Sequence, residues 1–409
     1  MPVDLIIRNI GELVYFKEEG LETVGKAAVA VSEGKIAAFG PEKTVLDSIE
    51  VSDSTTFIDA HGHSVIPAFV DPHTHLIYGG CRHEEFLARL KGKEYLELMK
   101  EGKGINYTVS LTRKESIESL KESSLTRLQQ MIANGILTVE IKSGYGLNLE
   151  TEKKILQVAD TLKDSSQIDI VTTFLGAHAI PAEFAGNRRE YINLLTEIMI
   201  PELREYAQFI DIFIDKGAFT VDEAREIFRC AEKYNYDLKM HIDELSYTGA
   251  AKLANEFEIT SAEHLEYTSE QDLEIFKERN VTPVLLPGTY FFLKSQKKPA
   301  VEVMRELNLP VALGTDHNPG TSPLYSQSLV MALAVFLYDM GIEEALRGAT
   351  WNAARALKLH HKKGNIAVGM DADMLILSTH SFVHLVYEIG NNQIETLIKK
   401  GKPLSIRSI

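Results

Sequence analysis

The sequence predicts an α/β protein: a distorted TIM-type (β/α)8 barrel with a small β-sandwich domain formed from both chain ends. Between residues 65 and 364, short apolar runs alternate with amphipathic helical stretches, a pattern typical of parallel strands joined by crossover helices. The flanking segments, 1–64 and 365–409, are made of short strands and turns instead. We therefore expect a barrel over 65–364 and one composite β domain from 1–64 plus 365–409.

Eight apolar runs of strand length are candidates for the barrel strands. In chain order they are Val65–Val70, Ile136–Ile141, Ile168–Leu175, Phe209–Ile214, Leu238–Ile242, Ile259–Ala262, Thr282–Leu286 and Pro310–Leu313. Capping-box patterns predict helix starts at Thr112, Thr220 and Thr268, and Asn134-Gly135 predicts a helix end. Two further helices are expected around Ile342–Leu357.

The two end segments contain their own strand signals. Ser32-Glu33-Gly34-Lys35 separates two apolar runs and predicts a hairpin turn. Near the other end, strands are expected at Gly364–Gly369, Asp373–Leu377 and Thr396–Lys399. Because both ends of the chain consist of short predicted strands, we expect them to pair with each other.

Composition excludes several classes of protein. A formal net charge of −15 over 409 residues disfavours nucleic acid and anionic membrane surfaces as partners. The two cysteines, Cys81 and Cys230, can form neither a disulfide framework nor a CxxC zinc motif. No apolar run is long enough to span a bilayer, and the first residues lack the features of a signal peptide. We expect a soluble, cytoplasmic protein.

Polar residues follow the predicted strands, at the ends where TIM barrels hold their catalytic groups. Five strands end this way, and the residues concerned are His73, His75, His178, His241, Glu244, Glu263, His264 and Asp316. Any one of these endings could be an ordinary turn. Five together predict a convergent site.

Four of these residues suit a metal ion. His73 and His75 are two apart, so both side chains point to the same side of a strand. Imidazole and carboxylate together favour zinc or iron, with one position kept open for water. Taken singly, His241 could be a core histidine and Asp316 a turn residue. As a set, the three histidines and the aspartate favour one metal site.

Two further residues can exchange protons near such a site. Glu244 lies three residues after His241, and His264 ends the next strand. The alternatives are a solvated loop carboxylate for Glu244 and an orienting hydrogen bond for His264.

Several motifs resemble the amidohydrolase superfamily, and within it the enzymes of histidine degradation that open an imidazolone ring. They are VDPHTHLIYGGCRHEEF (70–86), EIKSGYGL (140–147), FLGAHAIP (174–181), MHIDE (240–244), SAEHLE (261–266), GTDHNPGTSP (314–323), ATWNAARAL (349–357) and GNIAVGMDADMLIL (364–377). The resemblance covers nearly the whole chain. HxH alone is weak evidence, whereas GYGL, GAHAIP and DHNPG together are specific.

The resemblance implies a role for each matching residue. One Zn2+ or Fe3+ per subunit would be held by His73, His75, His241 and Asp316. Glu244, His264 and Asp316 would be the catalytic residues beside the attacking water. The substrate or its ring-opened product would contact Arg82, Tyr145, His178, Glu244, Asn318, Gly320 and Thr321. The protein is expected to be a homodimer acting on a small anionic substrate.

The implied reaction is hydrolysis of the lactam C–N bond of 4-imidazolone-5-propanoate to N-formimidoyl-L-glutamate. The planar guanidinium of Arg82 suits the propionate carboxylate, although an ion pair with Glu84 or Glu85 is the alternative. Two other functions stay open: deamination of a purine- or triazine-like ring, and a non-catalytic barrel used as a scaffold.

The number of metals also follows from the resemblance. Other members of the superfamily bridge two metals with a modified lysine from the fourth strand. Here that strand, Phe209–Ile214, contains no lysine, and Lys216 lies beyond its end. One metal is therefore favoured, although Lys142 on the second strand leaves a second site open.

Overall fold

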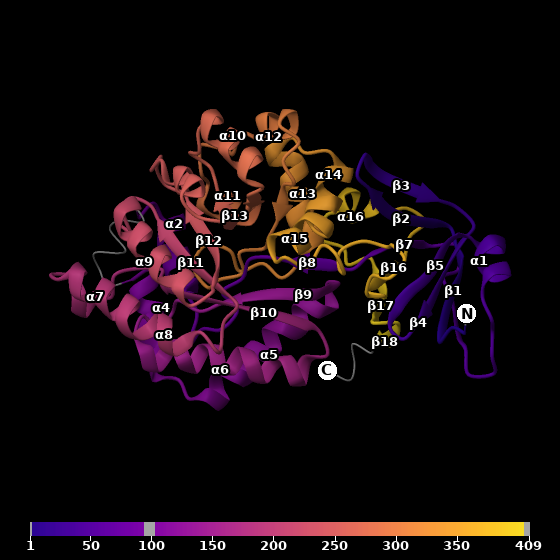
Figure 1. Cartoon of the computed structure of the whole chain (residues 1–409), viewed down its shortest axis with the longest axis horizontal. Coiled ribbons are helices and arrows are strands. Elements are labelled where there is room, and N and C mark those ends of the chain that lie inside the picture. Colours follow the sequence, from indigo (N-terminus) through magenta and orange to yellow (C-terminus); the bar gives the residue numbers. More distant parts are fainter. Residues whose placement is uncertain (1, 94–102, 405–409) are drawn as a thin grey trace.

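The computed structural model describes residues 2–93 and 103–404, and its centre is a parallel eight-stranded barrel (Figure 1). Its strands neighbour one another in chain order, and they are β8 (Phe69–Asp71), β9 (Ile136–Lys142), β10 (Asp169–Ala177), β11 (Phe209–Ile214), β12 (Asp237–Ile242), β13 (Ile259–His264), β14 (Thr282–Leu285) and β15 (Ala312–Leu313). Backbone hydrogen bonds just beyond β8 and β15 join the first and last strands: His75 N donates to His317 O, and Asp316 N to His73 O. The predicted fold class is confirmed.

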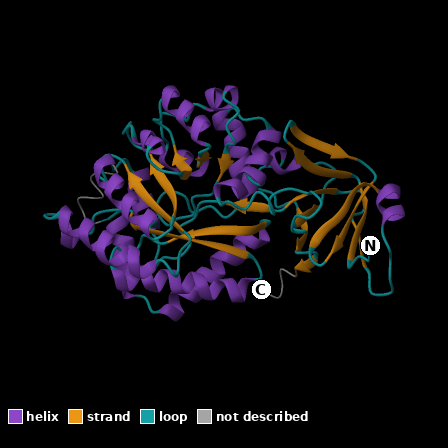
Figure 2. Cartoon of the chain, in the orientation of Figure 1, coloured by secondary structure: helices purple, strands orange, loops and turns teal. Residues whose placement is uncertain are grey.

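Helices cover the outside of the barrel (Figure 2). The α-helices are α2 (His83–Leu90), α4 (Ile105–Lys114), α5 (Ile117–Ala133), α6 (Leu149–Ser166), α7 (Arg188–Leu194), α8 (Ile200–Leu203), α9 (Val221–Lys233), α10 (Glu270–Arg279), α11 (Pro287–Leu293), α12 (Val301–Glu306), α13 (Gln327–Tyr338), α14 (Ile342–Gly348) and α15 (Trp351–Ala356). Shorter helical turns are η1 (Ala182–Phe184), η2 (Leu195–Met199) and η3 (Ala250–Asn255).

Two of the three predicted helix starts are wrong. Thr220 does form a complete capping box with Glu223. Thr112 instead lies inside α4, where its hydroxyl donates to Thr108 O, and Ser116 caps the following helix. Thr268 misses by one residue, because Ser269 caps α10. Serine and threonine accept hydrogen bonds from several local backbone groups, so the pattern alone does not select which of them is the cap.

The first predicted strand, Val65–Val70, is two strands in two different sheets. β7 (Ser64–Pro67) pairs with β2 (Glu12–Lys17) and β16 (Met374–Leu377), whereas β8 pairs with β9. Pro67 has no N–H to donate, which suits the end of a strand. Because both halves are buried and apolar, the run gives no sign of the change of sheet.

The β domain consists of two sheets (Figure 1, right-hand side). One has the order β5-β4-β1-β6 and the other β18-β17-β16-β7-β2-β3. The remaining bounds are β1 (Leu5–Ile10), β3 (Gly20–Val24), β4 (Ala27–Ser32), β5 (Lys35–Pro41), α1 (Glu42–Ser48), β6 (Thr56–Asp59), α16 (His384–Tyr387), β17 (Ile394–Lys399) and β18 (Lys402–Leu404). A buried cluster containing Leu13, Val29 and Ile376 packs strands from both chain ends together.

The hairpin predicted at Ser32–Lys35 is confirmed, with Glu33 at φ 50° and Gly34 at φ 75°. The strand predicted at Gly364–Gly369 is wrong. Asn365 occupies the edge of β2 with its side chain, which accepts from Phe16 N and donates to Phe16 O. The side-chain amide of Asn365 thus makes the hydrogen bonds to β2 that a backbone strand would otherwise make. The exact division of the chain into residues 65–364 and the two ends stays a prediction.

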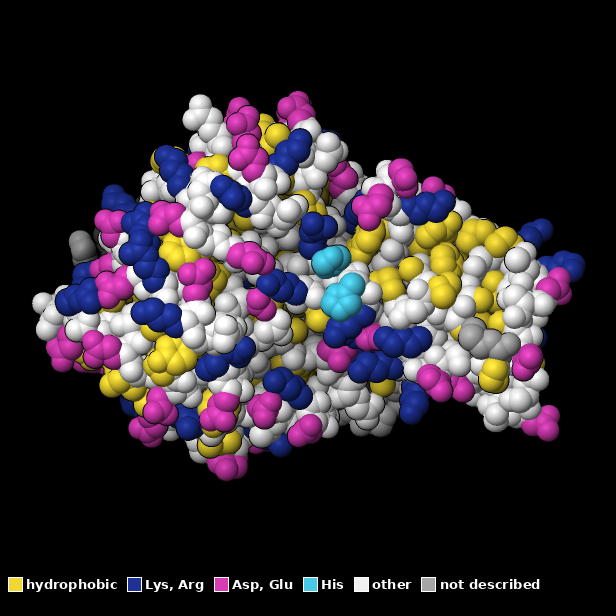
Figure 3. Space-filling view, viewed as in Figure 1, with side chains coloured by type: hydrophobic (Ala, Val, Ile, Leu, Met, Phe, Trp, Pro, Cys, Tyr) yellow, Lys and Arg dark blue, Asp and Glu magenta, His cyan; other side chains and the backbone are white. Residues whose placement is uncertain are grey.

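Within the described residues, no helix is both long and apolar enough to cross a membrane. Acidic and basic side chains are interspersed on the face shown in Figure 3.

Candidate active site

Three histidines converge at the C-terminal ends of the barrel strands. His73 and His75 follow β8, and His241 lies on β12. One ring nitrogen from each lies within 4.8 Å of the others, and all three side chains are buried. The Nδ1 atoms of His73 and His241 lie close to carboxylates without forming a complete hydrogen bond, and their Nε2 atoms have no hydrogen-bond partner among the described residues. Such nitrogens are placed to coordinate a cation.

Asp316, which follows β15, adds a carboxylate to the histidines. Its Oδ1 lies 3.4 Å from His73 Nε2 and 3.5 Å from His75 Nε2. Thr289 donates its hydroxyl hydrogen bond to the other carboxylate oxygen. Burial by itself would raise the pKa of Asp316, but the hydrogen bond and charge of His73 hold it at about 2. The backbone of Asp316 has φ 49°, an uncommon conformation for a non-glycine residue.

Five charged residues lie inside the barrel next to these histidines. The sequence placed Glu263 at a strand end of the predicted site and left Lys142 open as part of a second metal site, but it assigned no role to the other three. We call them the barrel charge layer: Glu140, Lys142, Asp211, Lys239 and Glu263, all completely buried. Two lysines face three carboxylates there. The available signal was that ionisable residues alternate with apolar ones within buried strands, as Glu140 and Lys142 do on β9, which points both side chains into the barrel.

The layer touches the histidines on their inner side. His73 Nδ1 lies 2.9 Å from Glu263 Oε2, and His241 Nδ1 lies 2.9 Å from Asp211 Oδ2. The opposite ring nitrogens therefore face Asp316 and His75. The carboxylates of Glu263 and Asp211 therefore lie on one side of the two rings, and the candidate cation position lies on the other side.

Glu244 and His264 lie together beside this cluster, with Glu244 Oε2 3.9 Å from His264 Nε2. Burial, together with the negative charges of Asp316 and Asp215, raises the pKa of Glu244 to about 8. Burial lowers the pKa of His264 to about 3. At neutral pH, Glu244 thus holds a proton and His264 is neutral. His264 has φ 76°, and backbone strain of this kind gathers at functional sites.

His178 and Tyr145 line the same end of the barrel. The His178 ring stacks on His75 with centroids 5.0 Å apart, and the Tyr145 ring lies 5.6 Å from His178. His178 Nδ1 lies 3.1 Å from the carbonyl oxygen of Gly144, which fixes that nitrogen as the donor. A Cβ atom on Gly144 would lie 2.8 Å from the same nitrogen, so only glycine allows this approach.

Arg82 is buried, and one edge of its guanidinium is occupied. Nε and Nη2 donate to Glu85 at 2.9 and 2.5 Å, which is the ion pair named as the alternative to substrate binding. Glu85 also accepts from Gly104 N. The remaining nitrogen, Nη1, lies against Gly320, where an added Cβ would be 2.0 Å away. The structure thus places Arg82 between Glu85 and the loop after β15.

Asn318, Gly320 and Thr321 form a compact turn rather than three separate contacts. Asn318 Oδ1 accepts from the backbone N–H groups of Gly320 and Thr321. Its amide donates to Asp316 O. The turn therefore ties the loop to the candidate metal ligand, and it places Gly320 on Arg82.

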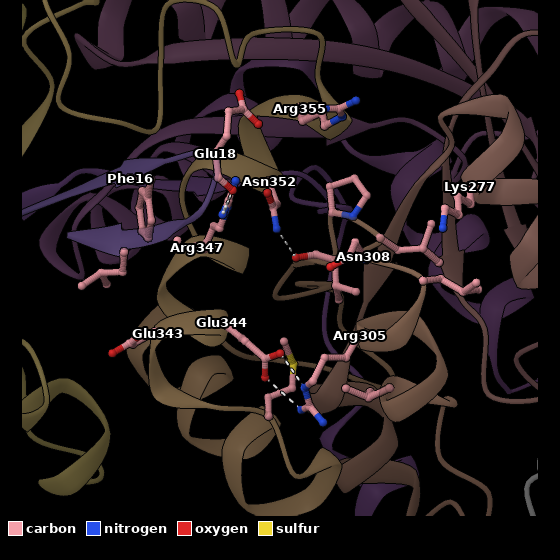
Figure 4. Close-up of a pocket in the computed structure, with 18 of the residues that line it drawn as sticks. Phe16, Glu18, Lys277, Arg305, Asn308, Glu343, Glu344, Arg347, Asn352 and Arg355 are labelled. Carbon is pink, nitrogen blue, oxygen red and sulfur yellow. Dashed lines mark hydrogen bonds and ion pairs between the residues drawn. The ribbon is translucent and has the colours of Figure 1, made fainter.

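A cavity of about 690 Å³ lies elsewhere, between β2–β3 and helices α10, α12, α14 and α15 (Figure 4). Its lining includes Val311, which precedes β15, so it opens at the end of the barrel opposite the histidines. An Arg305–Glu344 ion pair occupies one side. None of the predicted site residues lines this cavity.

The residues present fit a divalent metal ion. The unpartnered imidazole nitrogens and the Asp316 oxygen form a donor set of the kind that zinc and iron favour. Glu140, Asp211, Glu263 and Asp316 supply four negative charges around Lys142 and Lys239. With the histidines neutral, as coordination requires, two negative charges are left over. Without a cation, Glu263 and Asp316 overcome the opposing effect of burial and raise the pKa of His73 to about 9, so its ring then carries part of the compensating charge. A buried excess of this size calls for a doubly charged cation.

This fold and donor set are those of a metal-dependent amidohydrolase. A model of the Amidohydrolase family matches residues 64–404, and the chain belongs to that family. Solved structures agree on the fold: a zinc-bound adenosine deaminase from Xanthomonas campestris has a TM-score of 0.72 at 18% identity, covering 98% of this chain and 93% of that one. A 5-methylcytosine deaminase from Klebsiella pneumoniae has a TM-score of 0.75 at 18% identity, covering 99% and 98%.

Sequence relatives narrow the placement to the imidazolonepropionases. The imidazolonepropionase of Geobacillus thermodenitrificans is 43% identical over 406 residues, covering 98% of this chain and 95% of the relative. That of Alkaliphilus oremlandii is 39% identical over 414 residues, covering 98% of both. This confirms the resemblance drawn from the motifs.

Proposed function

We propose that this protein hydrolyses the lactam C–N bond of 4-imidazolone-5-propanoate and releases N-formimidoyl-L-glutamate, a step of histidine degradation. The observation that carries the proposal is the convergence of His73, His75, His241 and Asp316 at the strand ends, with Glu244 and His264 beside them. Near-complete coverage by imidazolonepropionases at 39–43% identity supports the choice of substrate.

His73, His75, His241 and Asp316 would hold one zinc or iron ion, and the charge balance favours a divalent one. When bound, such an ion polarises a carbonyl and lowers the pKa of a water molecule. Lys142 argues against a second ion, because its ammonium lies 2.6–3.0 Å from three carboxylates. An ammonium held in this way is not available for the modification that bridges two metals.

The bonds and protons of the hydrolysis must balance, and this requirement suggests which residue moves each proton. Water oxygen forms a bond to the ring carbonyl carbon, the carbon–nitrogen bond breaks, and one water proton ends on the departing nitrogen. Glu244 holds a proton at neutral pH and would deliver it to that nitrogen, and the proton taken from water would then pass back to Glu244, which restores the starting state. Asp316 or the neutral His264 would accept the proton from water. Strained backbone at His264 and Asp316 supports a role for both residues in holding this geometry.

The other residues would bind the substrate. Tyr145 and His178 would hold the ring, because their side chains line the same end of the barrel as the histidines. Arg82 would read the propionate, either with Nη1 or after releasing Glu85. The turn of Asn318, Gly320 and Thr321 would close the site next to Arg82.

A direct assay tests the proposal. Purified, metal-loaded protein should consume fresh 4-imidazolone-5-propanoate, followed by its ultraviolet absorbance, and yield N-formimidoyl-glutamate by mass spectrometry. Asp316→Asn serves as the inactive control. Release of ammonia from a purine or triazine ring, with no consumption of the imidazolone, would overturn the proposal.

The deaminase alternative gains nothing from the structural likeness to deaminases, which at 18% identity concerns the fold alone.

A homodimer in the cytoplasm completes the proposal. Light scattering of the purified protein tests the oligomeric state.

A further inference from the structure

The barrel charge layer is connected so closely that its members act as one unit. Lys142 Nζ lies 2.6 Å from Asp211 Oδ2 and 3.0 Å from both Glu140 Oε2 and Glu263 Oε2. Lys239 Nζ lies 2.7 Å from Glu140 Oε1, 3.0 Å from Glu263 Oε1 and 3.1 Å from Pro72 O. Each ammonium has three donors and three oxygens around it. The positions of the carboxylates are therefore fixed before any ion binds.

Among the described residues, Glu263 and Asp211 are the members of the layer that lie within ion-pair distance of the ring nitrogens of candidate ligands, whereas a Glu140 oxygen comes within 4.8 Å of one in His73. Glu263 lies 2.9 Å from His73 Nδ1 and 3.4 Å from His241 Nδ1, and Asp211 lies 2.9 Å from His241 Nδ1. Glu140 contacts the two lysines and the hydroxyl of Thr173 instead. The same buried layer thus contains both carboxylates that touch histidine and one that does not.

A carboxylate at Nδ1 determines which nitrogen of the ring is free. An ionised carboxylate only accepts hydrogen bonds, so once a cation takes the Nε2 side, a carboxylate at Nδ1 favours the tautomer with the proton on Nδ1 and a lone pair on Nε2. Nε2 is the atom that faces Asp316 in His73. The contact also stops the ring from turning about χ2. Both effects prepare the histidine for coordination.

We propose that Glu263 and Asp211 are positioning residues that set the tautomer and orientation of His73 and His241, with Lys142 linking the two carboxylates. The inference rests on the proposed metal site. It adds that metal affinity depends on residues on the far side of the ligand rings from the proposed ion. Outer carboxylates of this kind typically change metal affinity by about 10–100-fold.

The test compares substitutions within the layer by their metal affinity. Zn2+ dissociation constants are measured by competition with a chromophoric chelator for Glu263→Gln, Glu263→Leu, Asp211→Asn and Glu140→Gln. Glu140→Gln is the matched control, since it removes one buried charge from the same layer without a histidine contact. Absorption spectra of the Co2+-loaded proteins report the ligand geometry, and melting curves of the metal-free proteins report folding.

We expect Glu263→Leu to weaken Zn2+ binding about 100-fold and to change the Co2+ spectrum. Glu263→Gln keeps an oxygen that can accept from Nδ1, so it should recover about tenfold of that loss. Asp211→Asn should resemble Glu263→Gln. Glu140→Gln should lower the melting temperature as much as Glu263→Gln does, yet weaken Zn2+ binding by no more than about threefold, because it leaves both histidine contacts intact.

Two results would overturn the inference. One is equal loss of affinity in Glu140→Gln and Glu263→Gln, which would mean that the layer matters only for folding. The other is wild-type affinity in the folded Asp211→Asn and Glu263→Gln proteins. The His73→Ala variant distinguishes a failure of this inference from a failure of the proposed metal site. If His73→Ala also binds Zn2+ with wild-type affinity, the proposed set of ligands is wrong. Turnover of the imidazolone is scored separately.

Discussion

Two largely buried clusters of lysines and carboxylates occur in the part of the chain that the structure describes, and only one of them lies beside histidines. The barrel charge layer underlies the candidate metal site. The second, which we call the junction cluster, joins β10 of the barrel to the β domain and consists of Asp169, Lys363, Asp371, Asp373 and Lys399. Its three aspartates are close enough to hold a metal ion by distance alone, within 4.8 Å of one another.

Lysines already occupy the junction cluster. Lys363 Nζ lies 2.5, 2.7 and 3.0 Å from Asp169, Asp371 and Asp373. Lys399 bonds to Asp169 and Asp373, and Lys35 to Asp371. Three lysines thus balance three aspartates. In the barrel, by contrast, the carboxylates outnumber the lysines, and imidazole nitrogens remain without partners. Proximity of acids does not define a metal site; uncompensated charge and unpartnered nitrogens do.

The largest expected effect is at the metal ligands. Asp316→Ala and His73→Ala should lose the bound metal and, with it, all measurable turnover, because a four-donor site does not tolerate the loss of one donor. Elemental analysis of protein purified without added metal measures this. Asp371→Asn in the junction cluster is the matched control and should retain about one ion per chain. Loss of metal from Asp371→Asn would mean that the junction cluster, and not only the histidine site, holds the ion.

Glu244→Gln should keep the metal and lose about 10²–10⁴-fold in kcat, the usual range for general acid–base catalysis. The amide keeps the shape of the side chain and removes its exchangeable proton. Steady-state kinetics and metal content are measured on the same preparation. If metal content fell together with kcat, Glu244 would belong to the ligands.

Lys399→Met should break the junction cluster and leave the metal site intact. Removing one member of a buried ion pair typically costs about 3–5 kcal/mol of folding free energy. Denaturant unfolding measures the change. Lys43→Met, which removes an exposed ion pair with Asp47, should leave stability nearly unchanged. Metal loss in folded Lys399→Met protein would show that the two clusters are coupled.

Arg82→Met should lower kcat/KM by about 10–200-fold, since a hydrogen bond to a charged group contributes roughly 1.5–3 kcal/mol. Metal content should be unchanged, because Arg82 touches Glu85 and Gly320 rather than the ligands. Wild type should prefer the acid over an analogue with an amide in place of the carboxylate. An undiminished preference in the variant would mean that Arg82 serves only as the partner of Glu85.

The last prediction concerns stability rather than activity, and it is a pH dependence at Glu244. Its pKa is raised from 4.5 to about 8, so the folded state favours the protonated form. Below pH 4.5 both folded and unfolded chains carry the proton, and Glu244 has no effect on stability. As pH rises from 4.5 to about 8, only the unfolded chain ionises, so wild type loses stability relative to Glu244→Gln. Melting temperatures across this range measure the difference. A constant difference would contradict the raised pKa.

The sequence by itself determined the fold class and was enough to propose residues for the candidate site. Strand–helix alternation gave the barrel, and Phe209–Ile214 was located to the residue. His73, His75, His241 and Asp316 could be proposed as a group because the C-terminal ends of parallel strands meet at one end of a barrel. Local pattern is sufficient for such conclusions, because burial and strand period are properties of neighbouring residues.

Only the tertiary structure decided where side chains from different strands meet. The run Val65–Val70 divides between two sheets, although its residues are uniformly apolar. Arg82 turns one edge of its guanidinium to Glu85, a choice that the sequence left open. The register of adjacent strands places Glu263 level with His241 and Asp211 level with Lys239, and the SAEHLE motif gave no sign that Glu263 lies behind the histidines. Charge compensation between distant residues is a property of their positions in space, so the sequence could name these residues without revealing which of them are paired.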